Sequence, residues 1–322
     1  MFMTSDRDSY PLTSILSVSE VLEQLEVMHQ QEESATYKCR DYIDDYDTFN
    51  YPSTIGKSLQ DERGIPVDRD CRVKMCEWCY QVTDFLQFKR ETVAISMSYL
   101  DRFLSTPHPR ARGSLHDRKE YQLAAMTSLY IAIKLFEPMV IDTQLLSTIS
   151  RGCYTELDIV NMEQEILTAL SWRVNGPTAH DFLSHMISLL FSSAQKYDDT
   201  AAMRTILDIS KFHVEIAVCD YDIALQKPSA VALASIFNSI EDIDENFFSS
   251  RSMYDFVECI ANASKLDTFS EEVNAVRARL LELNSGCELQ KAANNIQSFN
   301  TRSTTSKLSA SPVSVKYFPR RA

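Results

Sequence analysis

The sequence predicts an all-α protein made of two consecutive five-helix domains behind an N-terminal helix. Its 322 residues include only 6 glycines and 10 prolines. Such a composition argues against a β-sandwich, a doubly wound sheet or a glycine-rich phosphate loop. Apolar residues recur at spacings of three and four rather than two, as on the buried face of a helix. The chain is also long enough for two domains whose cores need no disulfide.

The first expected helix runs from about residue 17 to 33. Ser17 and Glu20 fit a capping box, in which each side chain bonds the other residue's backbone N–H. An apolar stripe of Val, Leu and Met follows the cap, so one face of this helix should be buried. Residues 35–66 are polar and acidic, and we expect an irregular linker there.

Five helices are then expected in the first domain. Their approximate ranges are 68–85, 90–105, 117–136, 142–150 and 155–171. Thr155 and Asp158 fit a cap for the fifth helix. Its apolar stripe can be drawn through Val160, with Glu163 or Met162 as the next member.

The helical pattern starts again after the Gly-Pro pair at 176–177. A cap at Thr178 and Asp181 precedes the first of five further helices. Their approximate ranges are 182–191, 200–218, 228–240, 252–263 and 270–284. Pro228 suits a first helical position, where its missing N–H costs nothing. The two halves share little sequence identity, so the repeat is one of architecture.

These boundaries divide the chain into four parts. The parts are an N-terminal helix and linker (1–66), a first domain (67–176), a second domain (177–285) and a tail (286–322). The tail is rich in Ser, Thr and Asn and lacks apolar periodicity. It cannot offset the entropy cost of ordering, so we expect it to be disordered.

Charge and composition exclude several functional classes. The formal net charge is -13, which is poorly suited to binding a nucleic-acid backbone. The 6 histidines and 8 cysteines form no ligand cluster, and Cys76 and Cys79 make a single CxxC without a second pair. We therefore expect no metal, no cofactor and no catalytic residues, with cysteines as core filler in a reducing compartment.

Nothing in the sequence indicates export or a membrane. No basic region followed by an apolar run opens the chain, so we expect no signal peptide. The apolar stretch 128–136 is too short to cross a bilayer. We expect no membrane partner.

Residues 71–105 read CRVKMCEWCYQVTDFLQFKRETVAISMSYLDRFLS, which resembles the start of a cyclin box. The matching positions are Arg72, Trp78, Glu91-Thr92 and Tyr99 to Ser105. The resemblance continues through YQLAAMTSLYIAIKLFE, NMEQEIL and LSWRVNGPTAHDFL, at 121–137, 161–167 and 170–183. It is strong over 68–183, weaker over 184–284, and absent from the tail.

The resemblance implies two cyclin-box domains and a regulatory subunit without chemistry of its own. Such a protein would bind and activate a cyclin-dependent Ser/Thr protein kinase and control cell-cycle progression, in the nucleus and cytoplasm. Some segments look more like D-type than mitotic cyclins. Alternatives are a non-activating cyclin-fold adaptor, a nucleic-acid-binding or transcription-related cyclin fold and, remotely, a helical enzyme. The helix at 17–33 resembles the extra helix before many cyclin boxes, and we expect it to pack on the first domain.

Lys134 interrupts an apolar run near the end of its expected helix. Taken alone, it is a lysine that extends to solvent and complements the helix dipole. By the resemblance, it matches the cyclin lysine that hydrogen-bonds backbone carbonyls beside the kinase's regulatory helix, and Glu163 matches the glutamate that acts with it. Apolar residues implied to line the kinase-facing surface are Leu135, Leu167, Trp172 and Val174. Core packing stays open for Leu167 and Val174.

Two further sets of residues follow from the resemblance. Arg72 and Asp101 match a buried pair in the family, and we expect a structural ion pair, because a buried charge needs a partner. Many cyclins also dock Arg-x-Leu motifs of substrates or inhibitors on an apolar patch. The matching positions here are Cys71, Lys74, Met75, Trp78 and Gln122. Lys74 places a charge where the family has Ile, so we expect a damaged or retuned patch; Trp78 as simple core stays open.

Overall fold

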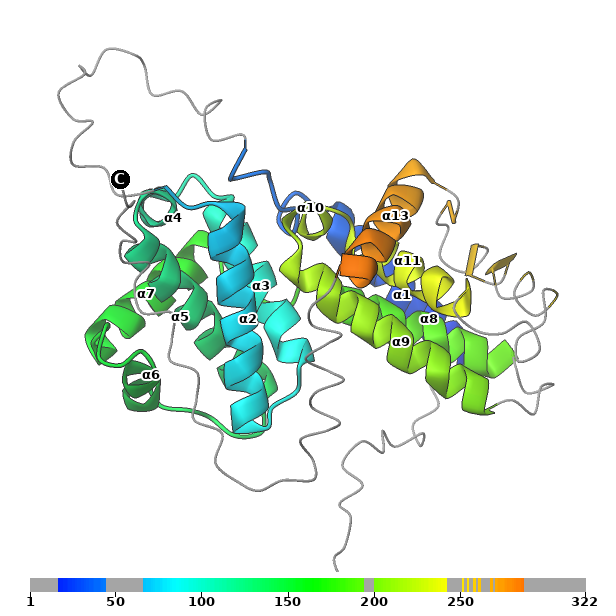
Figure 1. Cartoon of the computed structure of the whole chain (residues 1–322), viewed down its shortest axis with the longest axis horizontal. Helices are drawn as coiled ribbons and strands as arrows, with labels where there is room; N and C mark the ends of the chain where they lie inside the picture. The colour runs from blue at the N-terminus through cyan, green and yellow to red at the C-terminus, as the bar shows by residue number, and fades with distance from the viewer. Residues whose placement is uncertain are drawn as a thin grey trace, which may run out of the picture.

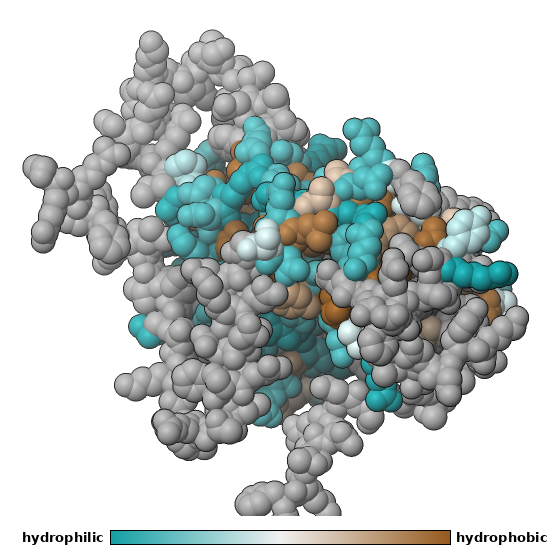
Figure 2. Space-filling view, turned by 45° about the vertical axis from the view of Figure 1, so that its right-hand side comes forward, coloured by the Kyte–Doolittle hydropathy of each residue, from teal (hydrophilic) through white to brown (hydrophobic). Residues whose placement is uncertain are grey.

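The computed structural model describes residues 17–44, 66–193, 200–241 and 271–286, and residues 251, 254, 257, 258, 260, 261, 267, 268 and 270. Two groups of helices lie next to each other in Figure 1. No strand occurs among the described residues, so the predicted all-α class is confirmed. On the face drawn in Figure 2, hydrophilic residues cover much of the described surface, with hydrophobic ones in separate areas between them.

The first lobe is the group of six helices that follows the linker. It comprises α2 (Arg69–Leu86), α3 (Glu91–Leu104), α4 (Pro109–His116), α5 (Arg118–Phe136), α6 (Thr143–Ile149) and α7 (Glu156–Ala169). Helix α5 is its centre, because every residue from Tyr121 to Ile133 is buried. Those thirteen positions carry no charged side chain, which allows α5 to be covered on all sides.

The second lobe repeats this arrangement around another central helix. It comprises α8 (Ala179–Ser193), α9 (Thr200–Cys219), α10 (Tyr221–Ala224), α11 (Pro228–Glu241) and α13 (Glu271–Gly286). The described residues between 251 and 261 are helical as well. Helix α11 is buried from Ser229 to Ile240 and corresponds to α5. The repeat is therefore visible in the order and packing of the helices.

Two short helices were not expected from the sequence, and they occupy equivalent places. Helix α4 lies between α3 and α5, and α10 lies between α9 and α11. Helix α4 begins with Pro109 at its first turn, and the ring of His108 accepts a hydrogen bond from the Arg110 N–H. Pro109 starts this helix of eight residues, and Gly113 lies within it.

Helix α1 (Val18–Glu33) forms where expected but packs on a different lobe. The capping box of Ser17 and Glu20 is present. Its buried residues Val21, Leu25 and Met28 belong to the hydrophobic core of the second lobe, where α1 packs on α8. The prediction that this helix packs on the first domain was therefore wrong.

The end of α1 explains this choice of lobe. The buried carboxylate of Glu32 accepts hydrogen bonds from the backbone N–H and the hydroxyl of Ser229, at 3.1 and 2.7 Å. Because Ser229 lies in the first turn of α11, Glu32 satisfies a free helix donor and complements the helix dipole. Lys227 forms a second tie to α1 through Glu33, at 2.6 Å.

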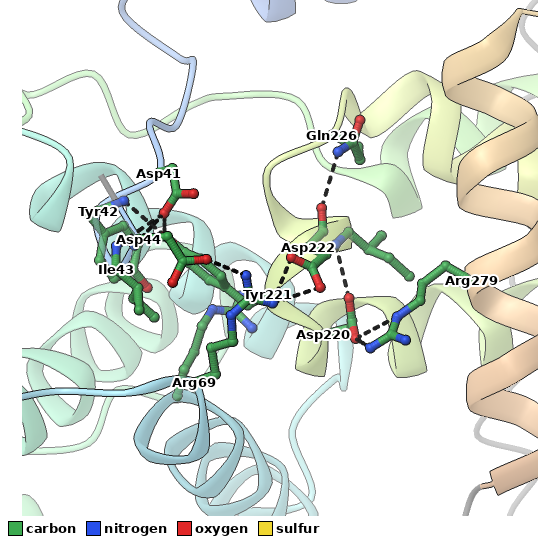
Figure 3. A network of polar contacts seen from close by, with 12 residues as sticks. Asp41, Tyr42, Ile43, Asp44, Arg69, Asp220, Tyr221, Asp222, Gln226 and Arg279 are labelled. Carbon is green, nitrogen blue, oxygen red and sulfur yellow. Dashed lines mark hydrogen bonds and ion pairs between the residues drawn. The ribbon is translucent and has the colours of Figure 1, made fainter. Parts of the chain in front are cut away.

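The segment after α1 is irregular, as expected, but part of it is buried between the lobes. Tyr42 donates its hydroxyl to Asp101 in α3 at 2.7 Å, and its backbone N–H donates to the Tyr221 hydroxyl at 2.9 Å. Figure 3 shows this contact beside Arg69, which joins Asp44 to the second lobe. The rest of the linker (45–65) and the tail beyond 286 lie outside the described residues.

Candidate partner-binding site

Lys134 and Glu163 meet between the end of α5 and the middle of α7. The Lys134 Nζ lies 3.0 Å from Glu163 Oε1. This hydrogen bond raises the pKa of Lys134 above its ordinary value. The lysine side chain is about half exposed, whereas the Glu163 side chain is only 14% exposed. The packed α7 helix thus holds the carboxylate in place, and the ammonium group extends from it toward solvent.

The pair leaves polar groups available for a partner. An ammonium group has three N–H donors and a carboxylate has two acceptor oxygens. Among the described contacts, one donor and Oε1 are used in the pair, and the ammonium also lies 5.6 Å from the centre of the Tyr130 ring. The remaining donors and oxygen are suited to backbone carbonyl and amide groups of another protein. Lys134 also lies in the last turn of α5, where its charge complements the helix dipole.

Large apolar side chains are exposed on the elements that carry this pair. Leu135 directly follows the lysine and is 49% exposed, and Trp172 beyond α7 is 69% exposed. Further exposed apolar residues on α5, α7 and the intervening segment are Phe136, Met139, Val140, Leu157 and Val160. Exposed apolar residues concentrated on neighbouring elements are typical of a protein interaction surface.

Sequence reasoning missed these additional residues, and for Val160 it pointed to the wrong face. The buried face of α7 runs through Ile159, Met162 and Ile166. Val160 is 46% exposed. Adjacent residues differ by about 100° around a helix, so a stripe drawn one residue late leads to the opposite conclusion. The burial of Met162 resolves the alternative between Met162 and Glu163 as the next member of that stripe.

The other two apolar residues named from the resemblance belong mainly to the core. Leu167 is buried in the first lobe, and Val174 is half-buried against the same core. Trp172 is held outward by a turn in which Ser171 and Trp172 both have positive φ, of 52° and 60°. The Trp172 N–H donates to the Leu167 carbonyl at 2.9 Å. This hydrogen bond caps the C-terminal end of α7, while the indole of Trp172 remains exposed to solvent.

Arg72 and Asp101 form a buried, two-bond ion pair. The Arg72 Nε and Nη2 donate to the two Asp101 oxygens at 3.0 and 2.7 Å. The remaining Arg72 nitrogen donates to the Val218 carbonyl at 2.8 Å, near the end of α9. The pair therefore joins α2 and α3 within the first lobe and ties both to the second. Both side chains are buried, which indicates a structural role for the pair.

The positions of the docking patch are divided between core and surface. Cys71, Met75 and Trp78 are buried on α2, and Trp78 is only 3% exposed. Gln122 is buried on α5, where its side-chain oxygen accepts from a tyrosine hydroxyl. Lys74 is exposed and lies 3.7 Å from an Asp side chain one turn earlier. This arrangement favours a packing role for Trp78, and docking of Arg-x-Leu motifs stays a prediction.

Within the described part of the chain, no group of three or more His, Cys, Asp or Glu side chains could hold a metal ion. No helix in that part is both long and apolar enough to cross a bilayer.

Comparison with known proteins adds the family to this geometry. Residues 47–175 match the family model described as cyclin, N-terminal domain. The chain is 26% identical to a G2/mitotic-specific cyclin-B2 of Oryzias luzonensis, over 68% of this chain and 53% of the relative. It is 26% identical to cyclin-B2-1 of Arabidopsis thaliana, over 54% and 37%. Residues 47–175 therefore form a cyclin N-terminal domain, and the chain is similar to cyclins over a longer stretch.

The matches to these relatives cover only part of each protein. The chain spans about half the length, or less, of these two relatives. Both carry B-type names, so they lend no support to the D-type leaning expected from the sequence. A viral cyclin from herpesvirus saimiri has the same fold, with a TM-score of 0.57, 18% identity, and coverage of 81% of this chain and 97% of that one.

Proposed function

We propose that this chain is a regulatory subunit that binds and activates a cyclin-dependent Ser/Thr protein kinase. The observation that carries the proposal is the Lys134–Glu163 pair, together with the exposed side chains of Leu135 in α5 and Trp172 after α7. The similarity to cyclins supports it, because the same two residues match the kinase-contacting lysine and glutamate of that family.

The interface would combine two physical contributions. Burial of the exposed apolar side chains would supply most of the binding free energy. The free donors of Lys134 and the free oxygen of Glu163 would bond backbone groups beside the kinase's regulatory helix. Their fixed spacing would make the contact specific for a helix end placed at that point. Binding would favour the kinase conformation in which the catalytic Lys–Glu pair and the activation loop are in place.

The pair should matter far more to binding than to folding. Because the lysine is about half exposed, the ion pair contributes at most about 1 kcal/mol to the free energy of unfolding. Loss of one partner of a charge pair buried in an interface typically costs about 2–5 kcal/mol of binding. That corresponds to a roughly 30-fold or greater loss of affinity.

The test compares Lys134→Ala and Glu163→Ala with a matched control on the same helix. Glu165 lies two residues from Glu163 and so on another face of α7. Its carboxylate is 3.4 Å from His108. Binding of each full-length variant to purified cyclin-dependent kinases is measured by calorimetry, and circular dichroism checks the fold. We expect both alanine variants to bind at least 30-fold more weakly while Glu165→Ala binds normally. Normal binding by folded Lys134→Ala and Glu163→Ala proteins would reject this interface.

Trp172→Ala provides an independent arm of the same experiment. Its indole is 69% exposed, so its removal should leave the unfolding temperature nearly unchanged. A large aromatic at the centre of an interface commonly contributes 2 kcal/mol or more, about a 30-fold change in affinity. A phosphorylation assay with the bound kinase then separates activation from adaptor function. Tight binding without a rise in kinase activity would favour the adaptor.

A further inference from the structure

Two cysteines from different lobes lie in contact at the junction of α2 and α9. The Sγ atoms of Cys76 and Cys219 are 3.1 Å apart, although 143 positions separate them in the chain. The CxxC spacing had linked Cys76 with Cys79 on the same helix. In the folded protein, Cys76 instead faces the last residue of α9. Two thiols in contact can form a disulfide, whereas a single buried cysteine cannot.

The two thiols have different surroundings, which suit them to different roles. Cys76 is fully buried, whereas Cys219 is partly exposed, so Cys219 is the more accessible residue of the two. Burial raises the pKa of the Cys76 thiol. The hydrogen bond from Cys76, assisted by the nearby Arg72 guanidinium, lowers the pKa of Cys219. The reactive form of cysteine is the thiolate, so Cys219 is the better nucleophile of the two.

Arg72 reinforces this asymmetry by its position. Its Nη1 donates to the carbonyl oxygens of Val218 and Cys219, at 2.8 and 3.2 Å. These bonds fix the end of α9 against α2 and hold the Cys219 sulfur next to the Cys76 sulfur. The sulfur contact is therefore maintained by the same buried ion pair that joins the lobes.

We propose that Cys76 and Cys219 are a site of oxidative modification, at which hydrogen peroxide converts the two thiols into a disulfide that cross-links the lobes. The Cys219 thiolate attacks one peroxide oxygen, the O–O bond breaks, and the leaving hydroxide takes a proton to become water. The Cys219 sulfenic acid formed is then attacked by the Cys76 sulfur, which forms the S–S bond and expels a second water. Two thiols and one peroxide thus give one disulfide and two waters.

The consequence is a covalent link between α2 and α9. It closes a very long loop of the unfolded chain, and long loops receive the largest stabilisation in the chain-entropy description. It also restrains any movement of one lobe against the other at this junction. The oxidised protein should resist thermal unfolding more than the reduced protein, by roughly 5 °C or more.

The experiment uses the full-length, reduced protein and graded hydrogen peroxide. Free thiols are then alkylated, and cross-linked peptides are identified by mass spectrometry without reduction. Cys76→Ser and Cys219→Ser test the pair. Cys79→Ser, on the same helix and equally buried, is the matched control, and Cys153→Ser removes an exposed thiol.

We expect a Cys76–Cys219 peptide in the unmodified protein and in both control variants. In Cys76→Ser, a sulfenic-acid probe should label Cys219 because no second thiol resolves it. Thermal stabilisation by peroxide should be reversed by a dithiol reductant and should be absent from both pair variants. Peroxide that oxidises Cys153 yet leaves Cys76 and Cys219 alkylated would overturn the proposal. A cross-link from Cys219 to Cys79, or sulfinic acid at Cys219 without a cross-link, would overturn it too.

Discussion

Replacing Asp101 with Asn should destabilise the protein severely, because Asp101 neutralises a guanidinium that water does not reach. Arg72 is only 1% exposed. Its Nε and Nη2 bond the two carboxylate oxygens, and the hydroxyl of buried Tyr42 donates to the same carboxylate at 2.7 Å. The substitution leaves the arginine charge buried without a counter-charge. Breaking a buried pair in this way typically costs about 3–5 kcal/mol, a large part of a domain's total stability.

The matched control makes the same change at an exposed pair on α2. Asp70 lies 3.7 Å from Lys74, and both side chains are more than half exposed. Asp70→Asn should lower the free energy of unfolding by about 1 kcal/mol or less. Urea unfolding followed by helical circular dichroism measures both variants. Similar small losses for Asp101→Asn and Asp70→Asn would refute the reasoning that burial gives the Arg72 pair its importance.

A double substitution tests the same reasoning from the opposite direction. Arg72→Met together with Asp101→Leu removes both charges and keeps apolar volume. The combined loss of stability should be smaller than the sum of the two single losses, because each single variant leaves an unpaired buried charge. Some loss should remain, since the Val218 carbonyl no longer receives its hydrogen bond from the arginine. If the loss in the double variant equals the sum of the two single losses, Arg72 and Asp101 do not stabilise each other as argued.

Three further predictions concern α1 and the docking patch. Glu32→Ala should cost about 1–3 kcal/mol and speed hydrogen exchange in α1, because the buried Ser229 donors lose their acceptor; unchanged exchange would contradict it. Hydrogen bonds from Lys227 and Lys38 lower the pKa of Glu33 from 4.5 to about 2. The contribution of Glu33 to the free energy of unfolding should therefore be full above about pH 4.5 and should be lost as the pH falls toward 2. Glu33→Gln should reduce this loss of stability at acid pH by no more than about 1 kcal/mol, since the pair is half exposed. Urea unfolding at several pH values measures it. Lys74→Ile should strengthen binding of Arg-x-Leu peptides in a titration, and equal affinity of both proteins would count against the patch.

Local features of the fold were predictable because local physics produces them. The caps at Ser17 and Glu20, and at Thr155 and Asp158, form as their spacing indicated. A capping box needs only residues three positions apart, so it can be recognised without tertiary information. The central position of α5 also follows from its uncharged run. The all-α class and most helix boundaries were therefore accessible from the sequence alone.

The candidate site was predictable only in part. The resemblance to cyclins pointed to Lys134 and Glu163, and the structure places their charged atoms 3.0 Å apart. The exposed Val160 was assigned to the buried stripe because a helical periodicity with one ambiguous residue permits two faces. Which face of α7 meets α5 depends on the packing of both helices, and no pattern within α7 alone contains that information.

Contacts between distant parts of the chain were decided by the tertiary structure alone. The docking of α1 depends on Glu32 reaching the first turn of α11, and Tyr42 is buried only because two lobes close around it. Cys76 had an evident neighbour in the sequence, yet its contact is with Cys219, 143 positions away. Such long-range contacts depend on the shape complementarity of two sets of packed helices. Helical periodicity reports that each surface is apolar, but not which other surface covers it.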